Sequence, residues 1–245
     1  MSLEKELGSA LDRGKITTVI VDADDTIQNS SKLLWGPAFK FFSARVAEGT
    51  GKNKGWVLRR TRQINNEIFR RDEWGVHPGK YHEVAVRIAD EMKYDPEKSW
   101  KLMKITMAMI YLAQIPLMRG AEKTIKTIQK TDRKVAVLSH SPQGRLELMR
   151  QGWNVENIEI FGWTTRQRKG QEAWAKAMKG MGATGREAIA VDDNLSSVLA
   201  AKLAGIETAV WIKPVWKEYA EGNAQDLIMI DRIGQLVPAL ISHFK

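Results

Sequence analysis

Short runs of apolar residues recur along the chain and predict the strands of a buried sheet. Six runs fit this description, at 16–21, 134–138, 158–161, 188–191, 208–212 and 227–230. Beyond residue 120, segments with helical spacing of apolar residues separate them, at 121–130, 144–152, 172–181, 196–203 and 233–244. Strands that alternate with helices of this length are typical of a doubly wound parallel sheet. The pattern therefore predicts an α/β, Rossmann-like fold.

Between 31 and 114 the pattern is helical only, which indicates an inserted domain. Apolar spacing predicts helices over about 33–46, 56–71, 80–92 and 97–113. Asp95 before Pro96 has the order of a helix cap and a first helical residue, and Gly75, Pro78 and Gly79 indicate a break over 72–79. We expect an α/β core domain from 1–30 and 115–245 and an all-α domain over 31–114. Residues 1–15 are expected to form a short helix or a disordered lead-in.

The first apolar run ends in a cluster of carboxylates. Asp22, Asp24 and Asp25 lie within four residues directly after it. Carboxylates at this spacing repel one another unless a cation sits among them, and a divalent metal prefers such oxygen ligands. Ligands of open α/β sheets bind outside the carboxyl ends of the strands. The sequence therefore predicts a metal site at the end of this strand.

Three further positions bear polar side chains that can take part in chemistry. Ser139 and His140 follow the run at 134–138, Lys169 lies at the head of a predicted helix, and Asp192 and Asp193 follow the run at 188–191. Each signal is weak alone, because a serine after a strand is usually a turn or cap residue and a lone lysine is usually exposed. The adjacent aspartates say more, since two neighbouring carboxylates at a buried strand end are costly without a cation.

Together these positions resemble the four motifs of the haloacid dehalogenase (HAD) superfamily, in order, across about residues 16–240. The segment V-I-V-D-A-D-D-T-I at 19–27 resembles the first motif, and K-G-Q-E-A-W at 169–174 resembles the third. The segment at 191–205 resembles the fourth motif with its trailing helix. One departure lies there: many members carry Asp or Asn about four residues after the second acidic position, where this chain has Ser197. A hydroxyl at that place could orient a metal-bound water, with weaker metal binding.

The resemblance implies a Mg²⁺-dependent phosphatase that works through an aspartyl-phosphate. Asp22 would be the nucleophile and Asp24 the general acid and base. Mg²⁺ would be held by Asp22, Asp193 and the backbone carbonyl of Asp24, while Asp192 would orient Lys169. Between the paired aspartates the direct ligand is assigned to Asp193, and the alternative, Asp192, stays open.

The remaining assignments concern the substrate. Lys169 and the metal would offset the negative charge of phosphate and nucleophile, and Ser139 would donate a hydrogen bond to a phosphoryl oxygen. Thr26 and His140 are assigned to substrate binding, and Thr26 can also hold the turn after the first strand. Dehalogenase members carry no Asp at the position of Asp24, so its presence favours phosphoryl chemistry.

The helical insert matches the family's cap domain in position. Caps of this kind close over the site and supply specificity. Cations beside the break at 72–79, above all Arg70 and Arg71, are expected to contact the leaving group. Other polar or aromatic residues gather there: Asn66, Trp74, His77 and Lys80. These residues are alternatively ordinary surface positions.

Composition and charge limit the partners. The formal net charge of +9 indicates an anionic partner or a lysine-rich solvated surface. The chain has no run of five basic residues, no cysteine, no apolar stretch of 18 residues and no apolar signal core. We therefore expect a cytoplasmic protein that acts on a small phosphorylated metabolite, without a membrane partner; nucleic acid is not favoured, and the oligomeric state stays open.

Two kinds of alternative remain. A phosphomutase or a phosphonate hydrolase would use the same scaffold. A protein of another class, non-catalytic and nucleic-acid-binding, is favoured only by the positive charge.

Overall fold

The computed structural model describes residues 1–71, 78–163, 170–213 and 226–245. Within these residues six strands form one all-parallel sheet in the order β3-β2-β1-β4-β5-β6. The strands are β1 Thr18–Val21, β2 Lys134–Pro142, β3 Ile158–Trp163, β4 Ala188–Asp192, β5 Thr208–Ile212 and β6 Ile228–Ile230. The prediction of a doubly wound parallel sheet is confirmed.

The strand order places the ends of β1 and β4 at the switch point of the sheet. The chain runs from β1 outward through β2 to β3 and then returns to β4 on the other side of β1. Val21 pairs with Val137 of β2 and with Val191 of β4. Because open α/β sheets bind ligands where the strand order reverses, the residues that follow Val21 and Val191 lie at the expected site.

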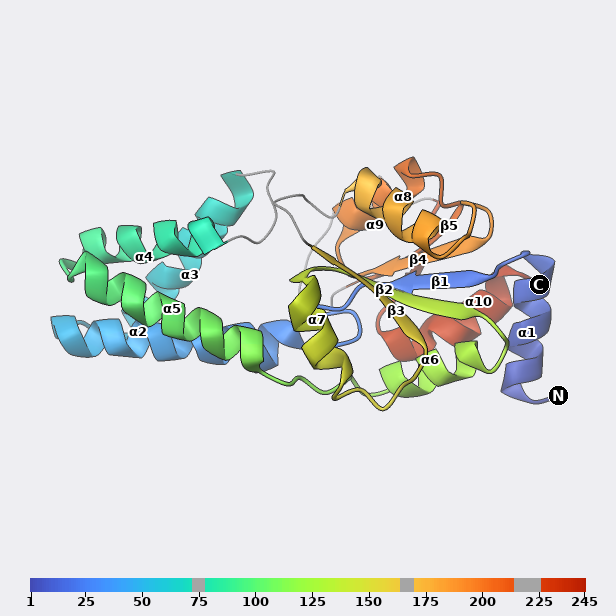
Figure 1. Cartoon of the computed structure of the whole chain (residues 1–245), viewed down its shortest axis with the longest axis horizontal. Helices are drawn as coiled ribbons and strands as arrows, with labels where there is room; N and C mark the ends of the chain where they lie inside the picture. The colour runs from blue at the N-terminus through green and yellow to red at the C-terminus, as the bar shows by residue number, and fades with distance from the viewer. Residues whose placement is uncertain (72–77, 164–169, 214–225) are drawn as a thin grey trace. The chain divides into compact units, whose positions relative to one another are not determined.

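Helices cover both faces of this sheet (Figure 1). One face packs against α1 Leu3–Arg13, α6 Ala121–Gln129, α7 Gln143–Arg150 and α10 Leu236–His243, and the other against α8 Gln171–Gly180 and α9 Leu195–Leu203. Alternation along β1 divides its side chains between the two layers, since Val19 and Val21 join the first core cluster and Ile20 joins the second. All of β1 is buried, as expected for a parallel strand covered on both faces.

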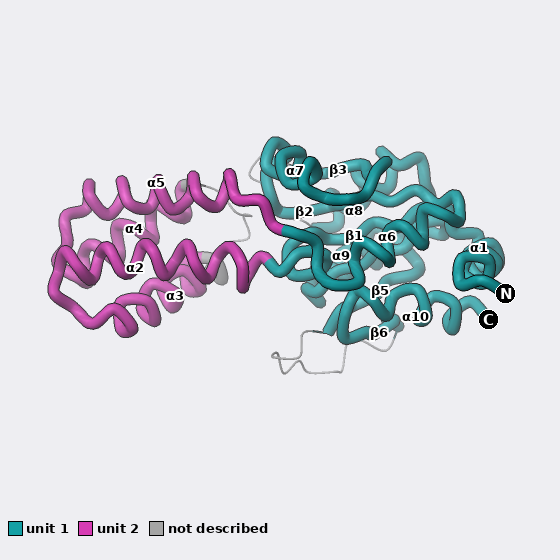
Figure 2. Tube along the Cα trace, turned by 90° about the horizontal axis from the view of Figure 1, so that it is seen from below, with its two compact units in different colours: residues 1–29, 116–163, 169–245 teal, residues 30–115, 164–168 magenta. Residues whose placement is uncertain are grey.

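The chain divides into two compact units, coloured separately in Figure 2. Unit 1 holds Met1–Asn29, Pro116–Trp163 and the described residues that follow, and unit 2 holds Ser30–Ile115. In unit 2 the structure describes helices only: a π-helical turn Ser31–Trp35, α2 Gly36–Thr50, α3 Lys54–Arg71, α4 Pro78–Met92 and α5 Pro96–Leu112. Their assignment as a cap over the site remains a prediction.

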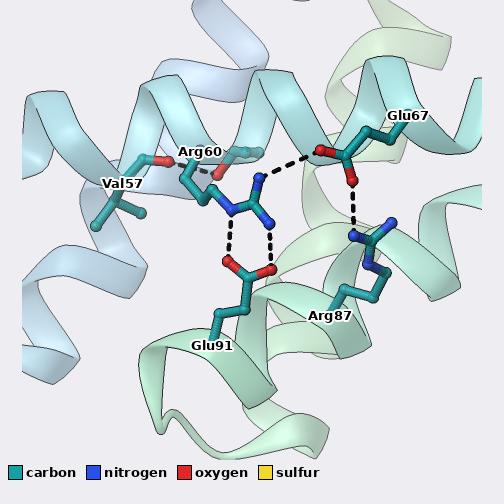
Figure 3. Close-up of polar contacts among 6 residues, drawn as sticks. Val57, Arg60, Glu67, Arg87 and Glu91 are labelled. Atoms are coloured by element: carbon teal, nitrogen blue, oxygen red, sulfur yellow. Dashed lines mark hydrogen bonds and ion pairs between the residues drawn. The ribbon is translucent and has the colours of Figure 1, made fainter.

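Unit 2 has its own apolar core and a half-buried ion-pair network between α3 and α4. Phe42, Val57, Ile64 and Ile88 are among its fully buried side chains. At the α3–α4 contact, Arg60 donates to both carboxylate oxygens of Glu91 at 2.5 Å, and Glu67 accepts from Arg60 at 3.3 Å and from Arg87 at 2.7 Å (Figure 3). The Arg60 guanidinium lowers the pKa of Glu91, and Arg87 lowers that of Glu67.

Residues 3–13 form a regular helix, α1, so of the two alternatives for 1–15 the short helix is confirmed and the disordered lead-in is wrong. Ser2 caps this helix, and Leu7, Ala10 and Leu11 are buried. Other predicted boundaries were wrong. Strand β2 continues to Pro142 instead of ending at 138, and its register against β3 shifts between Leu138 and Pro142.

Helix ends differ as well. Pro78 and Gly79 belong to α4 instead of a break, since proline fits the first turn of a helix; the rest of the predicted break lies outside the described residues. The closing helix begins with a 3-10 turn, Ile233–Gln235. None of the described helices is both long enough and apolar enough to cross a membrane.

Candidate functional site

Three carboxylates meet where β1 and β4 end. Asp22, Asp192 and Asp193 each offer one carboxylate oxygen, and these three atoms lie within 4.8 Å of one another. Asp22 and Asp192 are buried and Asp193 is half-buried. The backbone N–H of Asp22 donates to the carbonyl of Val191 at 2.8 Å, so the ladder between β1 and β4 continues up to the cluster. Hard oxygen donors at this spacing fit a divalent cation such as Mg²⁺, which would offset their mutual repulsion.

The backbone of Asp193 is held on both sides. Its N–H donates to the hydroxyl oxygen of Thr26 at 3.1 Å, and its carbonyl accepts from the indole N–H of Trp211 at 3.0 Å. Both partners are fully buried. Thr26, predicted to bind substrate, therefore has a structural contact with the neighbouring loop, and its contact with substrate remains a prediction.

Asp192 and Ser197 are positioned by the start of α9. One oxygen of Asp192 accepts from the backbone N–H of Asn194 at 2.8 Å, and the side chain of Asn194 caps the helix by accepting from Ser196 N–H at 3.0 Å. Ser197 is buried, and its hydroxyl oxygen accepts from the indole N–H of Trp174 at 3.2 Å. Its proton remains available for a further acceptor, so its predicted role in orienting water stays a prediction.

A tight turn follows Asp22 and sets the place of Asp24. Asp25 has a left-handed backbone with φ of 60°, which aspartate tolerates better than most residues. Its N–H donates to the carbonyl of Gln28 at 2.6 Å, and the N–H groups of Ile27 and Gln28 donate to the carbonyl of Ala23. The turn leaves the Asp24 side chain 28% exposed.

The end of β2 contributes two hydroxyls and a cation to Asp24. Ser139 and Ser141 lie 3.5 and 3.2 Å from the same carboxylate oxygen, Oδ2. Arg145 of α7 donates to the Ser141 hydroxyl at 2.5 Å and lies 4.0 Å from Asp24 Oδ1. Ser139 was predicted to contact phosphate, and that contact remains a prediction.

Sequence reasoning missed Ser141 and Arg145. The available signal was the spacing of the two serines, since residues i and i+2 of a strand share a face. His140, which lies between them, is half-buried. Its predicted contact with substrate stays a prediction.

Several predicted residues lie outside this description. Lys169, Trp74 and His77 are not among the described residues. Arg70 and Arg71 end α3, and their side chains are likewise not described. Lys80 lies in α4, in agreement with the helix predicted over 80–92, and is buried, so the alternative that it is an ordinary surface residue is wrong.

Solved structures include proteins of the same fold at low sequence identity. A 2-haloacid dehalogenase from Pseudomonas syringae pv. Tomato matches with TM-score 0.60 and 17% identity, covering 94% of this chain and 100% of that protein. A candidate β-phosphoglucomutase from Thermotoga maritima has TM-score 0.67 and 16% identity, with 93% and 99% covered. The candidate HAD-hydrolase YfnB from Bacillus subtilis, with magnesium bound, has TM-score 0.67 and 15% identity, with 92% and 98% covered.

Comparison with protein-family models and with curated proteins finds no match. The structural matches extend over more than nine-tenths of the chain in each of these three cases. The chain therefore has the fold of the haloacid dehalogenase-like hydrolases.

Proposed function

We propose that this protein is a Mg²⁺-dependent phosphatase of the HAD superfamily that hydrolyses a small phosphomonoester. The observation that carries the proposal is the meeting of Asp22, Asp192 and Asp193 at the switch point of the sheet, with Asp24 on the turn directly after Asp22. One carboxylate is thus available as a nucleophile and another as an acid and base, beside oxygen ligands for a cation.

Asp22 and Asp24 divide the chemistry between them. A carboxylate oxygen of Asp22 attacks phosphorus and forms an aspartyl-phosphate, while the bond from phosphorus to the ester oxygen breaks. Asp24 gives its proton to that oxygen, which leaves as an alcohol. Asp24 then takes a proton from the water that attacks the aspartyl-phosphate, and inorganic phosphate is released as Asp22 is restored.

The side chains of Asp22 and Asp193 and the carbonyl of Asp24 would hold Mg²⁺, with Asp192 beside them. The bound ion would supply positive charge where the nucleophile and the phosphate would otherwise repel. In this chain, Thr26 and Trp211 keep Asp193 in place for that role through its backbone. Lys169, outside the described residues, is proposed to supply a second positive charge.

Asp24 distinguishes the proposed reaction from dehalogenation, which is the activity named for several structural neighbours. A halide leaves as a stable anion and needs no proton, whereas an alkoxide leaves poorly unless it is protonated. An acid beside the nucleophile therefore supports ester hydrolysis. The helical unit 2 is proposed to act as the cap that selects the alcohol part of the substrate.

The test is a screen of the purified protein against a panel of phosphomonoesters, with phosphate release as the readout. We expect activity with Mg²⁺, none with a chelator, and a phosphorylated Asp22 in peptides from acid-quenched reactions. Phosphoryl transfer to a second sugar hydroxyl without phosphate release would indicate a mutase instead. Halide release from 2-haloacids without phosphate release from any ester would overturn the proposal.

A further inference from the structure

A buried arginine, Arg145, lies next to the carboxylate of Asp24. The Arg145 side chain is 3% exposed, and its Nη1 lies 4.0 Å from Asp24 Oδ1 and 2.5 Å from the hydroxyl oxygen of Ser141. Burial of a guanidinium is costly unless its charge and its N–H groups are matched. A cation buried at this cost beside the proposed acid and base therefore points to a function for Arg145.

The start of α7 is fixed against β3, so Arg145 is held in place. The Gln143 side chain accepts from the N–H of Gly162 at 2.7 Å and donates to the carbonyl of Ile160 at 3.2 Å. Gly162 permits this approach, because a Cβ there would lie 2.6 Å from Gln143 Cα. Arg145, two residues further along α7, thus projects from an anchored helical turn.

The direction of each hydrogen bond follows from donor chemistry. A guanidinium can only donate, so the Ser141 hydroxyl must accept from Arg145, and its own proton is left for Asp24 Oδ2 at 3.2 Å. The Ser139 hydroxyl accepts from the N–H of Ser141 at 3.1 Å, and its proton is directed to the same oxygen at 3.5 Å. Arg145 therefore fixes the orientation of the Ser141 hydroxyl as a donor to Asp24.

We propose that Arg145 is a positioning residue for Asp24 and acts through the hydroxyl of Ser141. The inference rests on the proposed function, in which Asp24 transfers the proton. Asp24 lies on a turn and is partly exposed, so its carboxylate can rotate unless it is held. Hydrogen bonds to Oδ2 and the cation beside Oδ1 restrict it to one orientation, and proton transfer depends on that geometry.

The experiment compares substitutions of two buried residues, Arg145 and Ser141, with a control substitution of an exposed arginine on α7. Arg145→Met removes the cation with similar apolar volume, and Ser141→Ala removes the linking hydroxyl. Arg150→Met is the control, because Arg150 is also on α7 but is 46% exposed and pairs with Glu147. Circular dichroism and thermal unfolding report whether each variant is folded.

The readout is kcat/KM for an alkyl phosphate and for a nitrophenyl phosphate, since this ratio covers the steps up to departure of the leaving group. Nitrophenolate leaves without a proton, so it depends little on Asp24. We expect Arg145→Met and Ser141→Ala to lose at least tenfold more on the alkyl ester than on the nitrophenyl ester. Arg145→Lys should recover part of that loss, and Arg150→Met should match wild type on both esters.

A second readout is the orientation of Asp24 in crystals of the two variants, which we expect to differ from that in wild type. Equal losses on both esters in a folded variant, with Asp24 unmoved, would overturn the inference while the proposed function stands. If Arg145→Met does not fold, Ser141→Ala alone tests the inference, by its relative losses on the two esters and by the orientation of Asp24 in its crystals. A wild-type protein that hydrolyses neither ester nor any other in the panel would overturn the proposed function itself.

Discussion

The hydroxyl oxygen of Thr26 accepts a hydrogen bond from the backbone N–H of Asp193, at 3.1 Å, across a sequence separation of 167 residues. This bond joins the turn after β1 to the turn after β4, beside the three clustered carboxylates. Thr26 is fully buried and Asp193 is half-buried, so removal of the hydroxyl takes away the protein partner of the Asp193 N–H. The geometry of the site thus depends on a residue whose side chain need not contact substrate.

Thr26→Val should destabilise the protein, because valine has the same shape but leaves the half-buried Asp193 N–H without its acceptor. The expected loss is about 1–3 kcal/mol in the free energy of unfolding, measured by denaturant titration. Thr26→Ser keeps the hydroxyl and should lose clearly less. A valine variant as stable as the serine variant would show that the bond contributes little.

Asp22→Asn should abolish turnover and leave the fold intact, because an amide is a poor nucleophile toward phosphorus. Phosphate release should fall to less than about a tenth of the wild-type rate, which corresponds to roughly 1.4 kcal/mol or more of barrier. Asp25→Asn is the matched control, since Asp25 is in the same turn, lies outside the carboxylate cluster, and has a left-handed φ that asparagine adopts readily. Asp25→Asn should keep most of the activity. If Asp22→Asn keeps more than about a tenth of the wild-type rate, Asp22 is not the nucleophile.

Mg²⁺ should raise the melting temperature of the wild-type protein, since a ligand that binds only the folded state stabilises it by about 2.7 kcal/mol at a hundredfold excess over Kd. Asp193→Asn should weaken this stabilisation more than Asp192→Asn does. The reason is that one oxygen of Asp192 already accepts from Asn194 N–H, a contact that an asparagine can keep. Calorimetric titration of both variants checks the order, and the reverse order would make Asp192 the direct ligand.

The Arg60–Glu91 pair should make the stability of unit 2 depend on pH. The Arg60 guanidinium lowers the pKa of Glu91 in the folded protein, so the stabilisation is present above the unfolded pKa of about 4.3 and is lost as the pH falls through the folded value. Glu91→Gln should therefore lower the unfolding free energy at pH 7, by at most about 1 kcal/mol for a partly exposed pair, and should make no difference near pH 2. Glu48→Gln is the control and should have a smaller effect, because the two ion pairs of Glu48, with Arg45 and Lys54, are more exposed than the Arg60–Glu91 pair. An effect of Glu91→Gln that persists at pH 2 would point to packing instead of charge.

The strands and their polar ends could be predicted because they depend on local patterns. The run before Asp22 is apolar and rich in β-branched residues, and the position of the carboxylates follows from where that run stops. The partners of these carboxylates could not be predicted in the same way. Ser141 follows Ser139 at a spacing of two, but its contact with Asp24 joins residues 117 apart in the sequence, which no local pattern indicates. Arg145 looks like one of many basic residues, and only the packing of α7 against β3 directs it to Asp24.

The proposal that unit 2 selects the substrate rests on Arg70 and Arg71. Their role in recognising the leaving group can be tested without knowledge of the substrate's structure. In the proposed function the motifs of unit 1 would bind the phosphate, so the leaving group would be recognised by other residues. Arg70→Gln with Arg71→Gln should raise KM for the best phosphomonoester of the panel at least tenfold, and should change KM for nitrophenyl phosphate by less than threefold. Arg59→Gln with Arg62→Gln removes two exposed arginines from the same helix and should leave both values unchanged. Equal losses on both esters would mean that Arg70 and Arg71 are structural, and efficient dephosphorylation of an intact phosphoprotein or a DNA end would overturn the assignment of a small substrate.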